Sequence, residues 1–194
     1  MVKRTGEKFQ LIIDAAVKVI ARYGYHQAQV SKIAKEAEVA DGTIYLYFEN
    51  KEDILVSLFD QKMGQFISQA EVQIKEKTDP REQLKALIEM HFAHLSANPE
   101  LAVVTQLELR QPNPGLRRKI NRILKRYLDL IDSVVRAGIE QGVFSEQTDV
   151  LAARYMIFGT LDESVTNWLM KERKYDLISM AEPVHRLFLN GLKT

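Results

Sequence analysis

The chain has 194 residues, of which 46% are hydrophobic and 27% are charged, a composition typical of a globular protein with a packed core. It contains no cysteine, which excludes a disulfide framework, a thiolate nucleophile and a cysteine-based zinc site. Its formal net charge is only +1, so any binding of nucleic acid must depend on charges that are placed locally.

No apolar run approaches the roughly 20 residues that a membrane-spanning helix needs. Near the amino terminus, Asp14, Lys18 and Arg22 interrupt the apolar stretch at helical spacing, which argues against a signal peptide. We therefore expect a cytoplasmic protein that does not have the membrane as a partner.

Apolar residues recur at helical spacing along almost the whole chain and no stretch alternates with period two, so we expect an all-α protein. The first helix has a candidate N-cap at Thr5 and a candidate stop at Gly24. A short second helix begins near Val30, and a third is predicted over residues 42–47. The fourth is predicted over residues 50–77, roughly 40 Å long at 1.5 Å per residue.

Five further helices are predicted from turn and cap signals, because proline suits the first turn of a helix and cannot continue one. The eighth and ninth are expected to span residues 149–171 and 176–192. The predicted starts are, in order, Asp79-Pro80, Asn98-Pro99, the Pro-Asn-Pro-Gly break at residues 112–115, Asp149 and Asp176.

The segment 30–47 has the spacing of a helix-turn-helix, whose second helix enters the major groove of DNA. Tyr45 and Tyr47 are predicted on that second helix, where a ring can cover a thymine methyl and a hydroxyl can reach a phosphate. Thr43 can donate to a phosphate, and Gly42 lets the backbone approach the DNA closely. Lys51 can neutralise a phosphate together with the N-terminal amides of the fourth helix.

Each of these assignments has a simpler alternative. Tyr45 and Tyr47 are otherwise ordinary half-buried tyrosines, and the neighbouring Ile44 and Phe48 are expected to be core residues.

The stretch GYHQAQVSKIAKEAEVADGTIYLYFENKEDIL resembles the N-terminal domain of TetR-family repressors. The matching positions are Gly24-Tyr25, Ile33-Ala34, residues 42–48, Lys51 and Ile54-Leu55. The resemblance implies a nine-helix TetR-like fold, with a three-helix DNA-binding domain at residues 1–50 and a ligand-binding and dimerisation domain at residues 51–194. It also implies DNA-binding roles for Lys3, Arg4, Gln29, Val30, Ser31, Gly42, Thr43, Tyr45, Tyr47 and Lys51.

Three positions depart from the family pattern, Glu38, Gln29 and Ala40. Glu38 replaces the glycine that ends the second helix, so a non-glycine residue is expected in a left-handed conformation at a cost on the order of 1 kcal/mol. Gln29 and Ala40 replace the usual Ser or Thr caps of the second and third helices. Asp41 is expected to cap the third helix or to complement its dipole instead.

Beyond the fourth helix, apolar residues are numerous enough to line a tunnel between helices, although a packed core is the alternative for any single one of them. Arg118 and Arg122 share a face of the predicted seventh helix with Lys125, and that face is either solvated or holds a phosphate-bearing headgroup. The predicted ligand-binding residues are Met63, Phe66, Ile67, His91, Phe92, Leu95, Val104, Leu107, Arg110, Arg118, Arg122, Tyr127, Phe158, Leu161, Asp162 and Trp168.

The stretches KMGQFI, LAVVTQLELRQ and MIFGTLDESVTNW are similar to one branch of the family, the regulators of fatty-acid degradation in bacilli. These release palindromic double-stranded operator DNA on binding long-chain acyl-CoA. The resemblance implies that DNA and an acyl-CoA or fatty acid are the partners, that acyl-CoA is the effector, and that no cofactor or metal is needed. It implies a homodimer through the eighth and ninth helices, with Tyr155, Phe158, Val165, Trp168, Met180, Val184, Leu187 and Phe188 at the interface.

Two alternatives remain open. A TetR-type sensor of another hydrophobic compound, such as a drug or a signalling lipid, differs only in its ligand. An enzyme would use the histidines and carboxylates of the second half, but two histidines without a third ligand and the lack of a catalytic signature favour a protein that is not an enzyme. The side chains that such an enzyme would use are Glu89, His91, His94, Glu108, Asp162 and Glu163.

Overall fold

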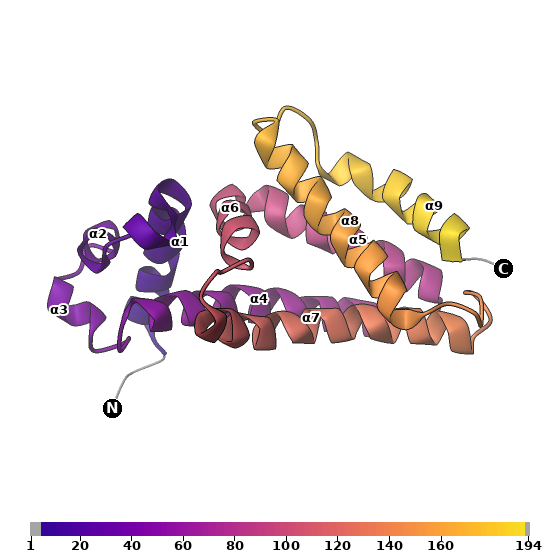
Figure 1. Cartoon of the computed structure of the whole chain (residues 1–194), viewed down its shortest axis with the longest axis horizontal. Helices are drawn as coiled ribbons and strands as arrows, with labels where there is room; N and C mark the ends of the chain where they lie inside the picture. The colour runs from indigo at the N-terminus through magenta and orange to yellow at the C-terminus, as the bar shows by residue number, and fades with distance from the viewer. Residues whose placement is uncertain (1–4, 193–194) are drawn as a thin grey trace. The chain divides into compact units, whose positions relative to one another are not determined.

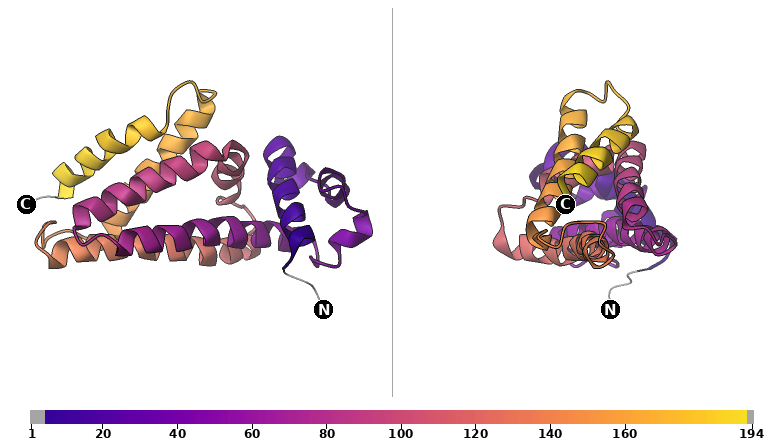
Figure 2. Two further views of the ribbon diagram at one scale, coloured as in Figure 1. Left: turned by 180° about the vertical axis from the view of Figure 1, so that it is seen from behind. Right: turned by 90° about the vertical axis from the view of Figure 1, so that its right-hand side faces the viewer.

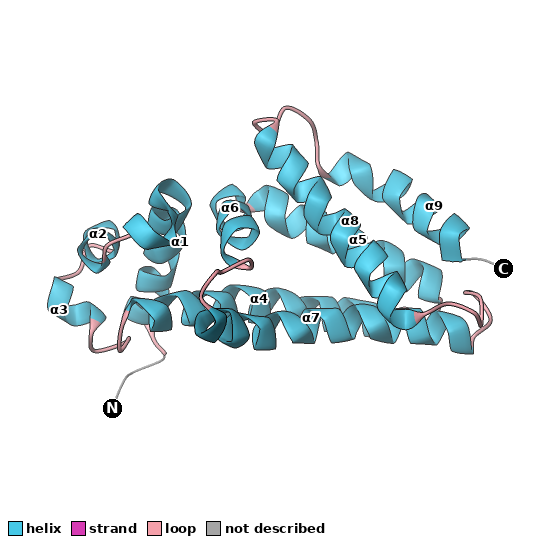
Figure 3. Cartoon of the chain, viewed as in Figure 1, coloured by secondary structure: helices cyan, strands magenta, loops and turns pink. Residues whose placement is uncertain are grey.

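The computed structural model describes residues 5–192, which form nine α-helices, one 3₁₀ turn and no strand (Figures 1 and 3). The all-α class is therefore confirmed for this part of the chain. None of the helices in this part is both long enough and apolar enough to cross a membrane. The elements are α1 (Glu7–Gln27), α2 (Val30–Glu36), α3 (Asp41–Ile44), α4 (Lys51–Lys75), α5 (Pro80–Ala97), α6 (Pro99–Glu108), α7 (Pro114–Glu140), α8 (Val150–Met170), the 3₁₀ turn η1 (Ile178–Met180) and α9 (Ala181–Leu192).

The chain divides into two compact units. Unit 1 comprises the described residues up to Gly64 together with Glu100–Ile123, and unit 2 comprises Gln65–Pro99 together with the described residues from Leu124 onward. Along the chain, α4 and α7 each begin in unit 1 and end in unit 2.

In unit 1, α1 packs against α2 and α2 packs against α3 (Figure 1). Ile44 and Phe48 are 1% and 0% exposed, so the prediction that both are core residues is confirmed. The ring of Phe48 stacks on Phe9 of α1, with 5.1 Å between the ring centroids. The end of α3 is thus fixed to the core through apolar contacts.

Two predicted ends of α1 are wrong. Gly6 rather than Thr5 occupies the N-cap position, with φ of 105° and no side-chain hydrogen bond, so Thr5 lies one residue too early to cap. Gly24 does not end the helix but kinks it, with φ of 72° and ψ of 157°, and helical residues continue to Gln27. Glycine adopts this positive φ without a steric penalty, which is why the kink forms there.

The third helix is shorter than predicted, because α3 ends at Ile44 and the two tyrosines lie in the tight turn that follows. The N–H groups of Leu46 and Tyr47 donate to the carbonyls of Thr43 and Ile44, three residues earlier, at 3.1 and 3.0 Å. Such bonds tighten the end of a helix into a 3₁₀-type turn. The prediction that Tyr45 and Tyr47 lie on the third helix is therefore wrong by one turn.

The departures from the family pattern have the expected backbone consequences. Glu38 has φ of 56°, and the N–H of Val39 donates to the carbonyl of Ala34 at 3.0 Å, which closes α2 as a glycine would. Gln29 and Ala40 occupy the N-cap positions of α2 and α3 without a side-chain hydrogen bond. Asp41 is the first residue of α3 and makes no capping bond, so it acts on this helix through its charge alone.

In unit 2, α5 packs against α8 and α9, and α9 packs against α8 (Figure 2). Arg154 of α8 holds Asp132 of α7 through two hydrogen bonds, one of them 2.7 Å long from Nε to Oδ1. The predicted starts of α5 and α6 are confirmed at Pro80 and Pro99. The ninth helix begins at Ala181 rather than near residue 176, because η1 comes first.

Candidate functional site

Unit 1 exposes the turn that follows α3. Tyr45 is 57% exposed and the adjacent Leu46 is 61% exposed, while Gly42 is also exposed and Thr43 is half-buried. Tyr47 is half-buried, and its ring lies 6.5 Å from that of Phe9. More than half of Tyr45 is therefore open to a partner, whereas the ring of Tyr47 lies partly against the core.

The other predicted DNA contacts surround the start of α2. Gln29 and Ser31 are exposed and Val30 is half-buried, at the amino end of that helix. Lys3 and Arg4 lie outside the described residues.

Lys51 is held by the end of α1. Its Nζ donates to the carbonyl of His26 at 2.9 Å and lies 4.6 Å from the centroid of the Tyr25 ring. Burial lowers the pKa of Lys51, and the nearby Glu108 opposes this shift. The ammonium group thus fixes the start of α4 to the segment after the Gly24 kink.

The first turn of α4 is capped by its own side chains. Oδ1 of Asn50 accepts from the N–H of Asp53 at 2.9 Å, and Oδ2 of Asp53 accepts from the N–H of Glu49 at 3.0 Å. The pair resembles a capping box, except that the Asp53 carboxylate bonds the amide of Glu49, one residue before Asn50. One of the N-terminal amides of α4, that of Asp53, is therefore already bonded within the chain.

Glu108 of α6 is a buried carboxylate, 6% exposed, that contacts the same segment. Its Oε1 accepts from the backbone N–H of Tyr25 at 3.2 Å, and its Oε2 accepts from Nε2 of Gln111. Burial, followed by the charges of Glu52 and Glu108, raises the pKa of Tyr25 to about 12. The sequence indicated Glu108 only as a candidate catalytic carboxylate, and this structural contact was missed.

A groove between α1 and α2 was also not predicted. Two of its cationic side chains lie near one aromatic ring, because Nζ of Lys32 is 4.0 Å and Cζ of Arg22 is 6.0 Å from the centroid of Tyr23. Carboxylates line it as well, so its charge is mixed rather than uniformly basic. The lining residues are Val19, Arg22, Tyr23, Lys32, Lys35, Glu36 and Glu38.

In unit 2, the structure brings together several of the predicted ligand-binding aromatics. The ring of Phe66 lies 6.3 Å from His91 and 5.5 Å from Tyr127, and Tyr127 lies 6.3 Å from Phe158. His94, which was not predicted in this role, stacks on Phe66 at 4.8 Å. We call these five residues, Phe66, His91, His94, Tyr127 and Phe158, the aromatic cluster.

A histidine–tyrosine pair lies at the centre of the aromatic cluster. Nδ1 of His91 is 2.9 Å from the hydroxyl of Tyr127, and both side chains are buried. Burial, with a smaller effect from His94, lowers the pKa of His91 to about 3, and burial raises the pKa of Tyr127. Both groups are therefore neutral near pH 7.

The remaining predicted ligand residues divide between the units. Met63, Val104, Leu107, Arg110, Arg118 and Arg122 belong to unit 1, and the other ten belong to unit 2. Leu107 is 56% exposed, and Arg110, Arg118 and Arg122 are exposed as well. Met63 is half-buried. Buried positions are taken by Ile67, Phe92, Leu95, Val104, Leu161, Asp162 and Trp168.

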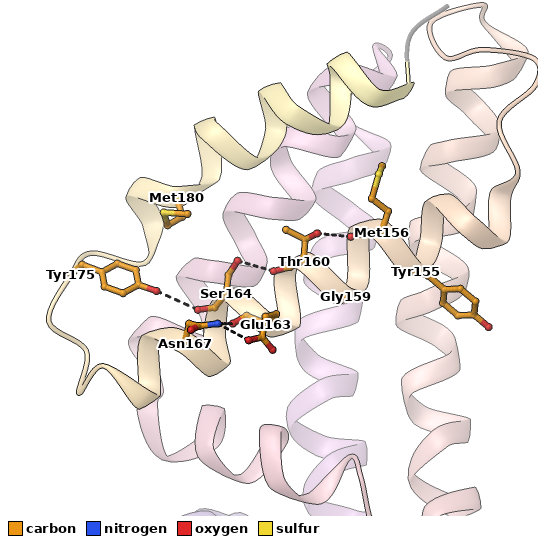
Figure 4. A pocket seen from close by; sticks show the side chains of 9 residues that line it. All are labelled: Tyr155, Met156, Gly159, Thr160, Glu163, Ser164, Asn167, Tyr175 and Met180. Atoms are coloured by element: carbon orange, nitrogen blue, oxygen red, sulfur yellow. Dashed lines mark hydrogen bonds between the residues drawn. The ribbon is translucent and has the colours of Figure 1, made fainter.

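A groove on α8 faces outward near the 3₁₀ turn (Figure 4). Thr160 donates to the carbonyl of Met156 and Ser164 donates to that of Thr160, both at 2.7 Å, so these hydroxyls are satisfied within their own helix. The surface that remains is largely apolar. The lining residues are Tyr155, Met156, Gly159, Thr160, Glu163, Ser164, Asn167, Tyr175 and Met180.

The predicted dimer residues differ in exposure. Tyr155 and Leu187 are 65% and 68% exposed, whereas Phe158 and Met180 are half-buried. Val165, Trp168, Val184 and Phe188 are buried within their own chain. Leu151, Met156 and Ile178 are exposed apolar residues on the same elements that the sequence did not indicate.

Within residues 5–192, no group of three or more His, Cys, Asp or Glu side chains is placed to hold a metal ion.

Comparisons with known proteins cover both units. Residues 12–58 match the family model "Bacterial regulatory proteins, tetR family", and residues 59–191 match "YsiA-like protein, C-terminal region". The fatty acid metabolism regulator protein of Bacillus subtilis is 56% identical over 190 residues, which are 98% of each chain.

Two solved structures share the fold closely. The fatty acid degradation regulator FadR of Bacillus halodurans is 59% identical with a TM-score of 0.92, over 95% of this chain and 100% of that one. FadR of B. subtilis in complex with stearoyl-CoA is 57% identical with the same TM-score, over 95% and 99% of the two chains.

Proposed function

This chain belongs to the TetR family of bacterial regulatory proteins, and from that premise we propose that it represses fatty-acid degradation genes and leaves its operator when it binds long-chain acyl-CoA. The observation that supports the proposal most directly is the likeness, over nearly the whole chain, to a FadR whose structure contains stearoyl-CoA. Because the likeness extends through residues 59–191, it covers more than a shared DNA-binding motif. A DNA partner also implies a cytoplasmic protein.

We propose that residues 1–50 bind DNA and that residues 51–194 bind the ligand and dimerise. The exposed Tyr45 and Leu46 offer apolar area to bases and sugars, and the hydroxyls of Thr43 and Tyr45 reach phosphates. Lys51 donates to the His26 carbonyl, which supports a role in orienting this segment in addition to any phosphate contact.

We propose that α8 and α9 form the homodimer interface. The exposed apolar side chains of Tyr155, Met156 and Leu187 support this, because apolar area of this kind is stabilised by a partner surface. A twofold dimer places two recognition segments on successive major grooves, about 34 Å apart, which requires a palindromic operator.

The aromatic cluster and the buried aliphatic residues of unit 2 supply an environment suited to an acyl chain. Each buried methylene contributes about 0.8 kcal/mol, so affinity is expected to increase with chain length until the site is filled. In unit 1, Arg118 and Arg122 expose guanidinium groups, which are of the kind that binds phosphate.

Release of the operator follows from thermodynamic linkage. An effector that prefers a protein geometry incompatible with DNA weakens DNA binding, and DNA weakens effector binding by the same factor. Ligand binding and DNA binding can be coupled through α4. This helix carries both Lys51, which is bonded to the end of α1, and Phe66 of the aromatic cluster. A ligand that shifts α4 therefore shifts the support of the recognition segment.

The experiment measures the affinity of the purified protein for a palindrome selected from random duplex DNA, by fluorescence anisotropy with and without ligand. Saturating palmitoyl-CoA or oleoyl-CoA is expected to raise the apparent Kd at least about tenfold, within the usual range of allosteric coupling. Coenzyme A alone serves as the control and is expected to change nothing. Unchanged DNA affinity at saturating acyl-CoA would overturn the proposal, and an assay for free thiol in the same samples detects any thioester hydrolysis.

A further inference from the structure

His91 carries a buried nitrogen that the chain itself does not satisfy. The residue is 8% exposed, and its Nδ1 is paired with Tyr127, but its Nε2 has no hydrogen-bond partner among the described residues. Buried polar atoms are nearly always paired, since an unpaired one is destabilising. A ligand group of opposite hydrogen-bonding character would therefore satisfy this nitrogen.

The hydrogen bond between Tyr127 and Nδ1 of His91 determines whether Nε2 is a donor or an acceptor. The bond to His91 is the one hydrogen bond that the described structure gives to the Tyr127 hydroxyl. If His91 donated from Nδ1, the buried hydroxyl proton of Tyr127 would have no acceptor, so the hydroxyl donates to Nδ1. The ring proton of a neutral imidazole then lies on Nε2, which is a hydrogen-bond donor.

The surroundings favour a neutral acceptor. The ring of His91 lies 5.7 Å from that of Tyr127, 6.0 Å from that of Phe92 and 6.3 Å from that of Phe66, so aromatic carbon encloses the pair. His91 itself stays neutral well below pH 7, because burial lowers its pKa to about 3. A carboxylate at this position would be buried against a neutral donor and would lose its hydration, which is unfavourable.

We infer that Nε2–H of His91 donates a hydrogen bond to the carbonyl oxygen of an acyl thioester, and that this bond favours acyl-CoA over the free fatty acid. A saturated acyl chain carries one hydrogen-bond acceptor, the carbonyl oxygen at its end, and everything beyond it is hydrocarbon. The buried donor thus meets the one acceptor that such a chain brings into an apolar site. The inference rests on the proposed function and names the group that recognises the ligand.

The test compares two ligands that differ at this oxygen. Palmitoyl-CoA carries the carbonyl, and S-hexadecyl-CoA is a thioether with the same number of chain carbons and a methylene in its place. By isothermal titration calorimetry, the unmodified protein is expected to bind the thioester roughly three- to tenfold more tightly than the thioether, the range for one neutral hydrogen bond. Palmitate, which presents a carboxylate, is expected to bind more weakly than palmitoyl-CoA.

Substitutions assign the difference to one nitrogen. His91→Leu removes the donor, and the Kd values of both ligands for this variant are expected to lie within about twofold of each other. His91→Gln restores an N–H near the position of Nε2 and is expected to regain part of the preference for the thioester. Tyr127→Phe removes the hydroxyl that fixes the proton on Nε2 and is expected to reduce the preference. His26→Gln changes an exposed histidine of unit 1, outside the aromatic cluster, and is the control that is expected to retain the preference.

The outcomes separate this inference from the proposed function. If the unmodified protein binds both ligands equally, or if the preference persists in His91→Leu, the inference is wrong although acyl-CoA binding stands. If neither ligand binds the unmodified protein, the proposed function itself has failed. Should His91→Leu not fold by circular dichroism, Tyr127→Phe decides instead, because an unchanged preference in that variant contradicts the assigned proton.

Discussion

The side chain of Glu108 accepts a hydrogen bond from the backbone N–H of Tyr25, 83 residues earlier in the chain and 3.2 Å away. This contact fixes the end of α6 to the segment after the Gly24 kink. Lys51 fixes the start of α4 to the same segment through the His26 carbonyl. Both helices are therefore tied to the residues that lead directly into the helix-turn-helix.

Replacing Glu108 by alanine is expected to lower the free energy of unfolding by about 1–3 kcal/mol, because it leaves the Tyr25 amide and the Gln111 side chain without their buried acceptor. Urea unfolding of the purified variants measures this loss. Leu107→Ala is the control at the next position, since Leu107 is 56% exposed and its truncation is expected to change stability by no more than about 0.5 kcal/mol. Equal stability of the two variants would mean that the Glu108 contact contributes nothing.

Tyr45→Ala is expected to weaken operator binding at least about tenfold while leaving the free energy of unfolding within about 0.5 kcal/mol of the original, because the side chain is 57% exposed. Fluorescence anisotropy with a selected palindrome measures the first effect and urea unfolding the second. Val72→Ala truncates an exposed apolar residue in unit 2 and is expected to change neither. A Tyr45→Ala protein with undiminished affinity for the palindrome would remove this tyrosine from the interface.

A charge on the proposed dimer surface is expected to dissociate the protein. Leu187→Glu places a carboxylate where α9 exposes 68% of a leucine, and burying it against a partner would cost several kcal/mol without a counter-charge. Sedimentation velocity is expected to show dimers for the original protein and mostly monomers for the variant. Leu11→Glu adds the same charge at an exposed leucine of α1 and is expected to remain dimeric. Monomers in both variants, or dimers in both, would contradict an interface on α9.

The depressed pKa of His91 predicts a specific pH dependence of stability. Above about pH 6.5 the imidazole is neutral in the folded and unfolded states, so its contribution is fully present. Between that pH and about 3 the unfolded chain takes up a proton that the folded protein does not, so the free energy of unfolding decreases by up to about 1.4 kcal/mol per pH unit.

Urea unfolding at pH 6.5, 5.5 and 4.5 measures this slope. His91→Gln lacks the titrating group, so its free energy of unfolding is expected to decrease less steeply as the pH falls. The difference in slope corresponds to nearly one proton bound on unfolding. The carboxylates titrate alike in both proteins, so the difference between their slopes isolates His91. His26→Gln, which removes an exposed histidine outside the aromatic cluster, is the control. A slope in His91→Gln as steep as in the original protein would show that His91 is not buried in its neutral form.

Local signals allowed much of the fold to be predicted. Pro80 and Pro99 lie where proline can only begin a helix, and the apolar residues Ile44 and Phe48 were predicted correctly as core. The errors at Thr5 and in the length of α3 have a different origin. Hydrophobic periodicity does not distinguish the last turn of an α-helix from a 3₁₀-type turn, and the true N-cap depends on the backbone conformation of Gly6.

The sites were harder to predict, because their contacts join distant segments. The sequence near Glu108 contains no sign that its partner is Tyr25. Likewise, nothing in the sequence distinguishes Lys51, which donates to the carbonyl of His26, from a lysine that is available to a phosphate. His91 was predicted as a ligand-binding residue from its place on an apolar helix face. Its hydrogen bond to Tyr127, and therefore its tautomer, became evident only once the two helices were placed side by side.

The hydrogen bond from the Trp168 indole to the carbonyl of Tyr175, 3.0 Å long, has a practical consequence. Trp168 is the chain's one tryptophan, it is 5% exposed, and it belongs to unit 2. Its fluorescence, excited at a wavelength that tyrosine absorbs little, reports on this environment alone. The protein thus contains a built-in optical probe of its own, and events in unit 2 can be timed by stopped flow without attaching a dye.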